Sequence, residues 1–122
     1  MTNKDIALAY LDSVSTKNMD RCGQLLAPDV KFHGPASQYK NATEILAAFR
    51  RLASIHVRND ITRVFTDGDE VCVIYDFVTD LGPVPTIEWL KVANGRITSI
   101  NLYYDQLPWV KIREEMQRRA AS

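Results

Sequence analysis

Hydrophobic residues recur every three or four positions in the first half of the chain, which is the spacing of helices. Residues 3–17 predict a first helix. Its apolar face comprises Ile6, Ala7, Tyr10, Leu11 and Val14. A weaker repeat in 19–29 predicts a second helix that Pro28 ends. After a short strand at 30–34, residues 42–55 predict a third helix.

Alternating apolar and polar positions follow and predict four antiparallel strands. These strands span 57–67, 70–80, 86–92 and 96–105. Asp67-Gly68 and Asn94-Gly95 are expected to form tight hairpin turns, because these residue types tolerate the positive φ that such turns require. The remaining turn is expected at 81–85, which contains a glycine and two prolines.

Helices followed by a run of hairpins are typical of an α+β fold. We expect a curved, mixed or antiparallel sheet that wraps around the N-terminal helices and leaves a cone with an open mouth. A chain of 122 residues is long enough for one core and short for two, so residues 1–122 are interpreted as a single domain. The tail at 106–122 is expected to add one turn of helix with a solvated, charged face.

Side chains of successive strand residues alternate between the two faces of a sheet. The inner face is expected to line a pocket together with the first helix. The expected lining residues are Tyr10, Val73, Tyr75, Phe77, Glu88, Leu90, Leu102 and Tyr104. The outer face carries Ile74, Ile87 and Trp89, a large apolar area to leave in water. A homodimer that buries this face is therefore expected.

The composition is that of an ordinary globular chain, with 46% hydrophobic and 25% charged residues. Fifteen basic and fifteen acidic residues cancel, so no overall field attracts nucleic acid or an anionic membrane. No apolar run reaches the roughly 18 residues that cross a bilayer, and the first residues do not read as a signal peptide. We therefore expect neither nucleic acid nor a membrane as a partner, and a cytoplasmic location.

Cysteine and histidine are too sparse to predict a disulfide or a metal site. Cys22 and Cys72 lie far apart, in a predicted helix and a predicted strand, and are expected to be buried free thiols in a reducing compartment. His33 and His56 have no ligand spacing between them, so no metal is expected. His56, at the start of a strand and among polar neighbours, is expected on the surface.

Glu88 is unusual because it occupies an inward position in the apolar strand at 86–92. Burial of an ionised carboxylate without partners is so costly that such a group usually stays neutral instead. Glu88 is therefore either the acid of the pocket, or a residue that reaches water or pairs with Lys91 or Arg96. The residues alone leave both interpretations open.

The chain resembles the nuclear-transport-factor-2-like superfamily, and within it the SnoaL-like and ketosteroid-isomerase-like branch. The order of the predicted elements, the opening ALAYLDSVSTKNMDRCGQLLAPDVKFHGP and the segment VANGRITSINLYYD carry the resemblance, which covers nearly the whole chain. It implies a cystatin-like α+β barrel whose pocket takes a small apolar molecule, and it implies no cofactor.

The resemblance also implies roles for single residues. Tyr10 matches the isomerase tyrosine that donates to an oxyanion, and Glu88 matches the protonated aspartate that supplies the second donor. The general base of that family, an aspartate before a proline, corresponds here to Gly34 before Pro35. The neighbouring His33 is then the candidate catalytic base, provided that a bulge turns it toward the pocket.

Another branch, similar to limonene-epoxide hydrolases, uses an arginine and two aspartates where this chain has Thr86, Glu88 and Leu102. Only one acid remains, so epoxide hydrolysis is not expected. SnoaL-like cyclases need mainly one acid/base carboxyl in an apolar cavity. We expect isomerase, cyclase or lyase chemistry on a ketone or polyketide-like substrate, with Glu88 as acid and Tyr10 as donor. The alternatives are a non-catalytic small-molecule binder of the same fold and a dimeric protein-interaction module.

Overall fold

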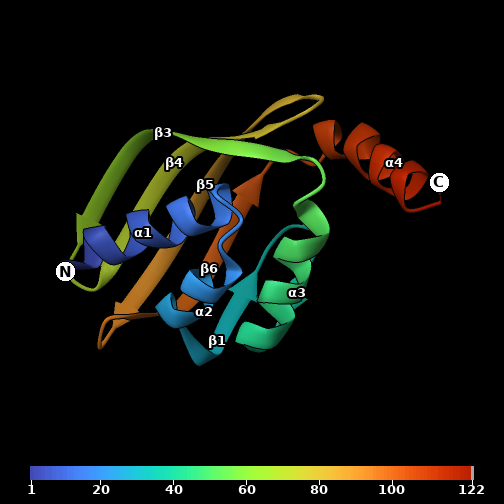
Figure 1. Ribbon diagram of the computed structural model, residues 1–122. Helices are drawn as coiled ribbons and strands as arrows, with labels where there is room; N and C mark the ends of the chain where they lie inside the picture. The colour runs from blue at the N-terminus through green and yellow to red at the C-terminus, as the bar shows by residue number, and fades with distance from the viewer. Residues whose placement is uncertain (122) are drawn as a thin grey trace.

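A strongly bent sheet encloses the helices in the computed structural model, which describes residues 1–121 (Figure 1). The helices are α1 (Asn3–Ser15), α2 (Met19–Leu25), α3 (Ala42–Leu52) and α4 (Leu107–Ala121). The strands are β1 (Leu26–His33), β2 (Gln38–Tyr39), β3 (His56–Asp67), β4 (Glu70–Thr79), β5 (Gly82–Ala93) and β6 (Arg96–Tyr104).

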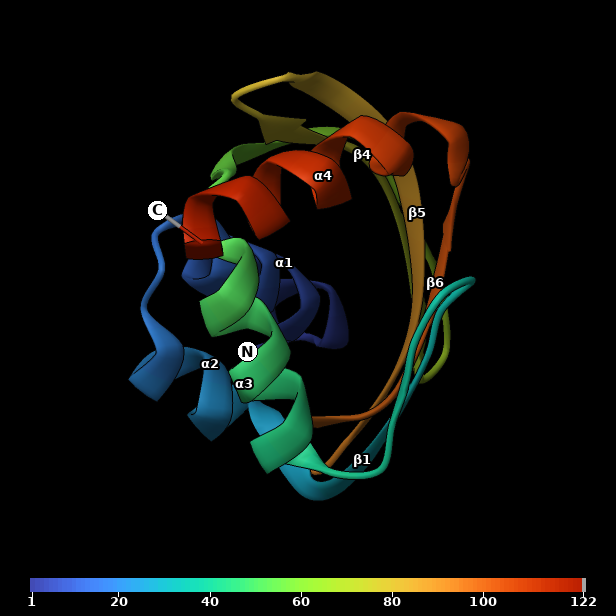
Figure 2. The same cartoon turned by 90° about the vertical axis from the view of Figure 1, so that its right-hand side faces the viewer.

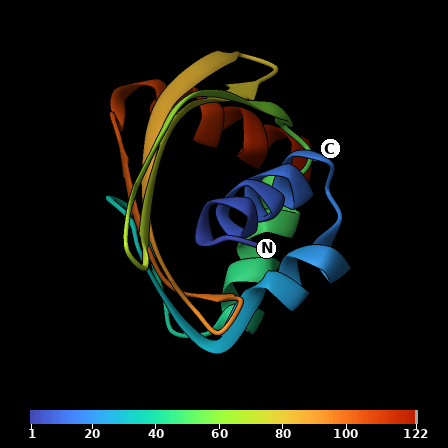
Figure 3. The same cartoon turned by 90° about the vertical axis from the view of Figure 1, so that its left-hand side faces the viewer.

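The six strands form one mixed sheet in the order β2-β1-β6-β5-β4-β3. The pairing of β1 with β6 is parallel, and every other pairing is antiparallel. Figures 2 and 3 show that the sheet bends around α1 and α3, while α4 lies across one end of the curve. The predicted α+β architecture with a curved sheet around the helices is confirmed, and of the two expected sheet types the mixed one is found.

The N-terminal helix begins where its sequence supplies a cap. The Thr2 hydroxyl accepts from the backbone N–H of Asp5 at 3.1 Å, and the Asp5 carboxylate accepts from the Thr2 N–H at 3.0 Å. Its apolar face is buried as the spacing predicts: Ile6, Ala7, Tyr10, Leu11 and Val14 all lie in the core. This burial fixes Tyr10 beneath the concave face of the sheet.

Strict alternation along β4 and β5 divides the sheet into a buried face and a more accessible face. From β4, Val73, Tyr75 and Phe77 point inward, and from β5, Thr86 and Glu88 do so. The opposite face is less covered, and Ile87 and Trp89 on β5 are each 38% exposed. The predicted partition of these strands is therefore correct.

Two proline segments differ from the prediction. Helix α2 ends at Leu25, and Pro28 lies inside β1 rather than ending the helix. The strand tolerates Pro28 because its pairing with β6 is interrupted between Leu26 and Lys31. Residues 81–85 are not a simple turn either, since β5 begins at Gly82. Its two prolines precede the residues that pair with β6, so no hydrogen bond to that strand is lost.

The C-terminal tail forms a helix of 15 residues, much longer than the single turn expected. Its Ile112 is buried in the core. Near its end, the Arg119 guanidinium donates to the Ser54 carbonyl at 2.7 Å and to the Asp80 carboxylate at 2.6 Å. Part of the charged face therefore ties α4 to the loop before β3 and to the turn after β4. No helix in residues 1–121 combines the length and the apolar character needed to cross a membrane.

Candidate functional site

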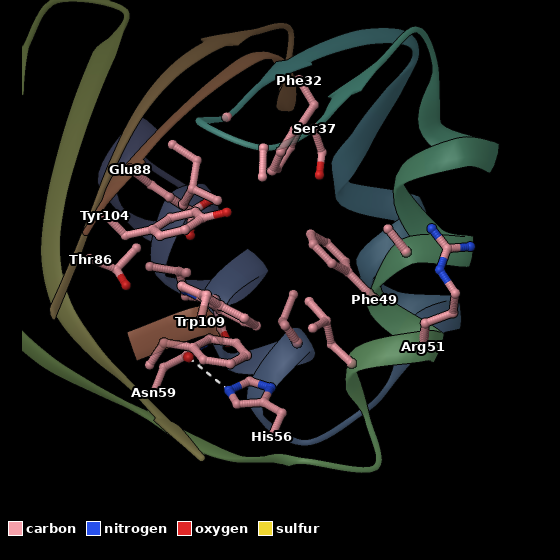
Figure 4. Close-up of a pocket in the computed structure, with 18 of the residues that line it drawn as sticks. Phe32, Ser37, Phe49, Arg51, His56, Asn59, Thr86, Glu88, Tyr104 and Trp109 are labelled. Atoms are coloured by element: carbon pink, nitrogen blue, oxygen red, sulfur yellow. Dashed lines mark hydrogen bonds between the residues drawn. The ribbon is translucent and has the colours of Figure 1, made fainter. Parts of the chain in front are cut away.

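A cavity of about 230 Å³ lies between the concave face of the sheet and helices α1, α3 and α4 (Figure 4). Its wall is mainly apolar and rich in rings. The aromatic residues that line it are Tyr10, Phe32, Tyr39, Phe49, His56, Tyr75, Phe77, Tyr104 and Trp109. An engineered cavity of about 150 Å³ holds benzene, so this cavity has room for a somewhat larger molecule.

Glu88 provides the only carboxyl group in the cavity wall among the described residues. Its side chain is buried, and both of its oxygens accept from tyrosines: the Tyr10 hydroxyl donates to Oε1 at 2.9 Å and the Tyr75 hydroxyl to Oε2 at 2.5 Å. Three elements meet here, because Tyr10 lies on α1, Tyr75 on β4 and Glu88 on β5. The helix spacing and the strand alternation that predicted these positions therefore converge on one cluster.

Burial dominates the electrostatics of this cluster. It raises the pKa of Glu88, and the two tyrosine hydrogen bonds offset the increase only in part. The pKa values of Tyr10 and Tyr75 lie well above their usual range, because of burial and because of the adjacent carboxyl group. None of the ion pairs in residues 1–121 involves Glu88. Relative to an exposed glutamate, the site shifts Glu88 toward the protonated form, which has a hydrogen to donate.

The sequence analysis placed His56 wrongly. It was expected on the surface, but it is only 4% exposed and lines the cavity. Its ring stacks on Phe77, with 4.1 Å between centroids, and its Nε2 lies 2.8 Å from Asn59 Oδ1. The pairing of β3 with β4 shifts between His56 and Arg58. This bulge turns His56 and Asn59 to the same face, although simple alternation would separate them.

The surroundings of His56 favour its neutral form. Burial lowers the pKa of the imidazole, and the positive charge of Lys17 acts in the same direction. The hydrogen bonds with Asn59 and with the backbone of Arg58 oppose the decrease. Figure 4 places His56 and Asn59 together at one end of the cavity, and Glu88 lies away from them. The cavity therefore contains one acid and one imidazole in different regions.

Other expected site residues lie elsewhere. His33 is exposed on β1 and pairs with Asn101 of β6, whereas its neighbour Phe32 faces the cavity. The bulge that would be needed to turn His33 inward is absent at that point, because the irregularity of β1 lies before Lys31. Val73 and Leu90 are fully buried in the core but do not line the cavity.

Gly34, at the position of the family's base, lines the cavity in a crowded place. A Cβ atom there would lie 3.3 Å from the Phe32 ring and 3.5 Å from the Ser37 carbonyl oxygen. A longer side chain at Gly34 would therefore require Phe32 to move. At this position the cavity wall has no titratable group, and Phe32 packs against Gly34 instead.

Helix α4 contributes residues that the sequence analysis did not assign to the site. Trp109, Arg113 and Met116 line the cavity from this helix. Trp109 packs against Phe77 and Tyr104, yet its buried Nε1–H has no hydrogen-bond partner among the described residues. The apolar spacing of Trp109, Ile112 and Met116 was the available signal, but the many charges between them obscured it.

Residues 1–121 contain no group of three or more side chains placed to hold a metal ion.

A family model of the SnoaL-like domain matches residues 7–100 of the chain. The chain belongs to the SnoaL-like family. The resemblance to the SnoaL-like branch of the nuclear-transport-factor-2-like superfamily is thus confirmed. A comparison with curated proteins finds no match to this SnoaL-like sequence.

Several solved structures share the fold of this SnoaL-like chain. An NTF2-like protein of unknown function from Cytophaga hutchinsonii is 21% identical, with 90% of this chain and 96% of that chain covered and a TM-score of 0.82. A candidate polyketide cyclase from Xanthomonas campestris is 18% identical, with 89% and 94% covered and a TM-score of 0.77.

A third structure comes from Catenulispora acidiphila and has a ketosteroid isomerase-like fold in complex with trimethylamine. It is 22% identical, with 85% of this chain and 88% of that chain covered and a TM-score of 0.71. At these levels of identity the neighbours establish the fold alone.

Proposed function

We propose that this SnoaL-like protein is a cofactor-independent acid/base enzyme of the isomerase or cyclase type, acting on a small ketone or polyketide-like substrate. The observation that carries the proposal is the buried carboxyl group of Glu88, held by the hydroxyls of Tyr10 and Tyr75 in an apolar cavity. The candidate polyketide cyclase among the structural neighbours is consistent with this chemistry.

The cluster suits a substrate whose carbonyl oxygen gains negative charge during the reaction. A protonated Glu88 donates a hydrogen bond to that oxygen, and Tyr10 supplies a second donor if its hydroxyl turns from the carboxyl group to the ligand. Such preorganised donors act strongly because the surroundings exclude water. The apolar walls then select the substrate by shape.

A second candidate function is non-catalytic binding of a small organic amine. Aromatic rings surround a single buried carboxyl group, an arrangement that suits an alkylammonium ion through cation–π contacts and one ion pair. The neighbour from Catenulispora acidiphila contains trimethylamine. The two candidates require opposite protonation states of Glu88, and this difference makes them separable.

The test is the pH dependence of binding, measured by calorimetry with β-naphthol as the enol mimic and trimethylamine as the amine. The proposal predicts that β-naphthol binds, and that its affinity falls as the pH rises through the elevated pKa of Glu88, because ionisation removes the donor. Amine binding would instead strengthen over the same range. Strengthening for trimethylamine together with no binding of β-naphthol would favour the amine binder and contradict the enzyme.

We further propose that the chain forms a homodimer through the outer face of the sheet. The register places Phe65, Cys72 and Trp89 in one row across three strands, and Ile74, Ile87 and Tyr103 in the next row. Phe65, Trp89, Ile87 and Tyr103 are exposed in the single chain. Burial of such a contiguous apolar area by a second copy is the simplest way to remove it from water.

Light scattering at micromolar concentration is expected to give about twice the chain mass of 13.9 kDa. Ile87→Glu should shift the mass to that of one chain, because it places a charge in the middle of the apolar rows. Leu107→Glu on α4, where Leu107 is 75% exposed, is the control and should leave the mass unchanged. A wild-type mass of one chain would refute the dimer without affecting the cavity.

A further inference from the structure

We propose that His56 is the catalytic base of the cavity and that the substrate is a carbon acid. Such a substrate is a ketone with an acidic C–H on the carbon next to the carbonyl group, and Glu88 binds the oxygen of that carbonyl group. This inference rests on the proposed function and adds the group that the family pattern lacks at Gly34. The enzyme would then use one acid and one base on the concave face of the sheet, in different regions of the cavity: Glu88 on β5 and His56 at the start of β3.

The hydrogen bonds around Asn59 determine which nitrogen of His56 is free to act. The Asn59 amide donates through Nδ2 to the Leu11 carbonyl at 3.1 Å, so its Oδ1 is the atom directed at the imidazole. A carbonyl oxygen can only accept, so His56 Nε2 must carry a hydrogen. In the neutral ring Nδ1 then has the lone pair, and it is the atom that can take a proton. The hydrogen bond with the Arg58 backbone raises the pKa of His56 and favours the imidazolium that this transfer forms.

The ring is held in place on two sides. Phe77 stacks on it, and Asn59 is itself anchored, because its backbone N–H donates to the Ser15 hydroxyl at 3.0 Å. Such support limits the rotation of the imidazole and fixes the direction of the base. A surface histidine would have no need of a stacked ring and an anchored amide.

The charged groups near the ring also favour a neutral base. Lys17, in the segment between α1 and α2, acts on the imidazole from the helical side, and Arg51 of α3 and Arg113 of α4 line the same cavity. No carboxylate is paired with the imidazole in residues 1–121. Burial moves the pKa of His56 down and that of Glu88 up, so both groups favour the uncharged forms that accept and donate a proton.

The proton transfer is balanced without any further reactant. The C–H bond breaks, its proton goes to His56 Nδ1, and its electron pair forms a carbon–carbon double bond. The π-electron pair of the carbonyl group moves to its oxygen, which receives the hydrogen bond from Glu88. Return of the proton from Nδ1 to a carbon of the conjugated system gives the isomer and restores the neutral imidazole.

The experiment follows the exchange of the acidic C–H of β-tetralone for deuterium by NMR in D₂O. Wild type is expected to accelerate exchange over buffer, with a rate that rises with pH through the lowered pKa of His56 and falls as Glu88 ionises. His56→Gln should lose at least about a hundredfold of this acceleration. The same variant should still bind β-naphthol, because Glu88 and its tyrosines remain.

Asn59→Asp is the second variant, and it guards against a His56→Gln protein that fails to fold. A carboxylate next to Nε2 stabilises the imidazolium, so the pH profile of exchange should move to higher pH, whereas a merely structural histidine would leave the profile in place. Wild type that binds β-naphthol with the expected pH dependence but exchanges β-tetralone no faster than buffer would overturn the role of His56 alone. Unchanged exchange in folded His56→Gln would also overturn it. Failure to bind β-naphthol would contradict the proposed function itself.

Discussion

Glu88→Gln is expected to slow proton transfer in the cavity by about a hundredfold or more, while binding of β-naphthol survives. Glutamine keeps a donor and an acceptor at the position between Tyr10 and Tyr75, but its amide N–H is a weaker donor than a carboxylic acid and stabilises the charge on the carbonyl oxygen less. The binding of β-naphthol should also become independent of pH. Exchange of β-tetralone and calorimetry, each measured over a range of pH, check both parts.

The companion measurement is an NMR titration of the Glu88 carboxyl group in wild type. We expect a pKa above the ordinary value of about 4.3, because burial disfavours the charged form. Tyr75→Phe is the matched control: it removes one hydrogen bond to the carboxylate but keeps the acid, so the pKa should rise further. A wild-type pKa at or below the ordinary value would show a solvated or paired acid and would leave Glu88 with a structural role.

The same shift has a consequence for stability. A carboxyl group that is held more tightly protonated in the folded chain contributes fully to stability below about pH 4.3, and the contribution is lost as the pH rises through the folded pKa. Glu88→Gln removes this loss. The difference in unfolding free energy between the variant and wild type should therefore move in favour of the variant between these two pH values.

Leu90→Ala is expected to lower the free energy of unfolding by about 2–5 kcal/mol while ligand binding stays intact. Leu90 is fully buried on β5 but lies outside the cavity, so the truncation leaves a void in the core. Leu102→Ala is the control, because Leu102 is half-buried and lines the cavity. Urea unfolding and β-naphthol calorimetry on both variants are the measurements.

The control should show the reverse pattern, with a smaller loss of stability and a clear change in affinity for β-naphthol. If Leu90→Ala weakened binding as much as Leu102→Ala did, the cavity would extend deeper than the structure shows. The original expectation that Leu90 lines the pocket would then be restored.

The positions of Tyr10 and Glu88 were predictable because both lie in regular elements. The i, i+3, i+4 spacing of α1 and the alternation of β5 each place one residue inward, and a curved sheet over a helix brings the two faces together. Tyr75 follows by the same alternation on β4. The regular periodicity of these elements was therefore enough to predict which residues form the acidic end of the cavity.

The imidazole end was not predictable in this way. The bulge near the start of β3 reverses the face of one residue relative to another, and nothing in the letters SIHVRND marks it. The aromatic contribution of α4 was missed because its charges resemble a solvated helix. Arg119 in fact joins α4 to Asp80 and to the Ser54 carbonyl, contacts that depend on the tertiary arrangement.

The parallel pairing of β1 with β6 sets the order in which the cavity can form. Phe32 pairs with Ile100, and the Tyr10–Glu88 hydrogen bond joins residues 78 positions apart. Contacts between such distant segments carry a large loop-closure cost and form slowly. During synthesis the hairpins of β3, β4 and β5 can assemble as they emerge, but β1 has no partner on its β6 side until the last strand is complete. The carboxyl group of Glu88 thus gains its neighbour Leu102 on β6 only after the chain is nearly finished.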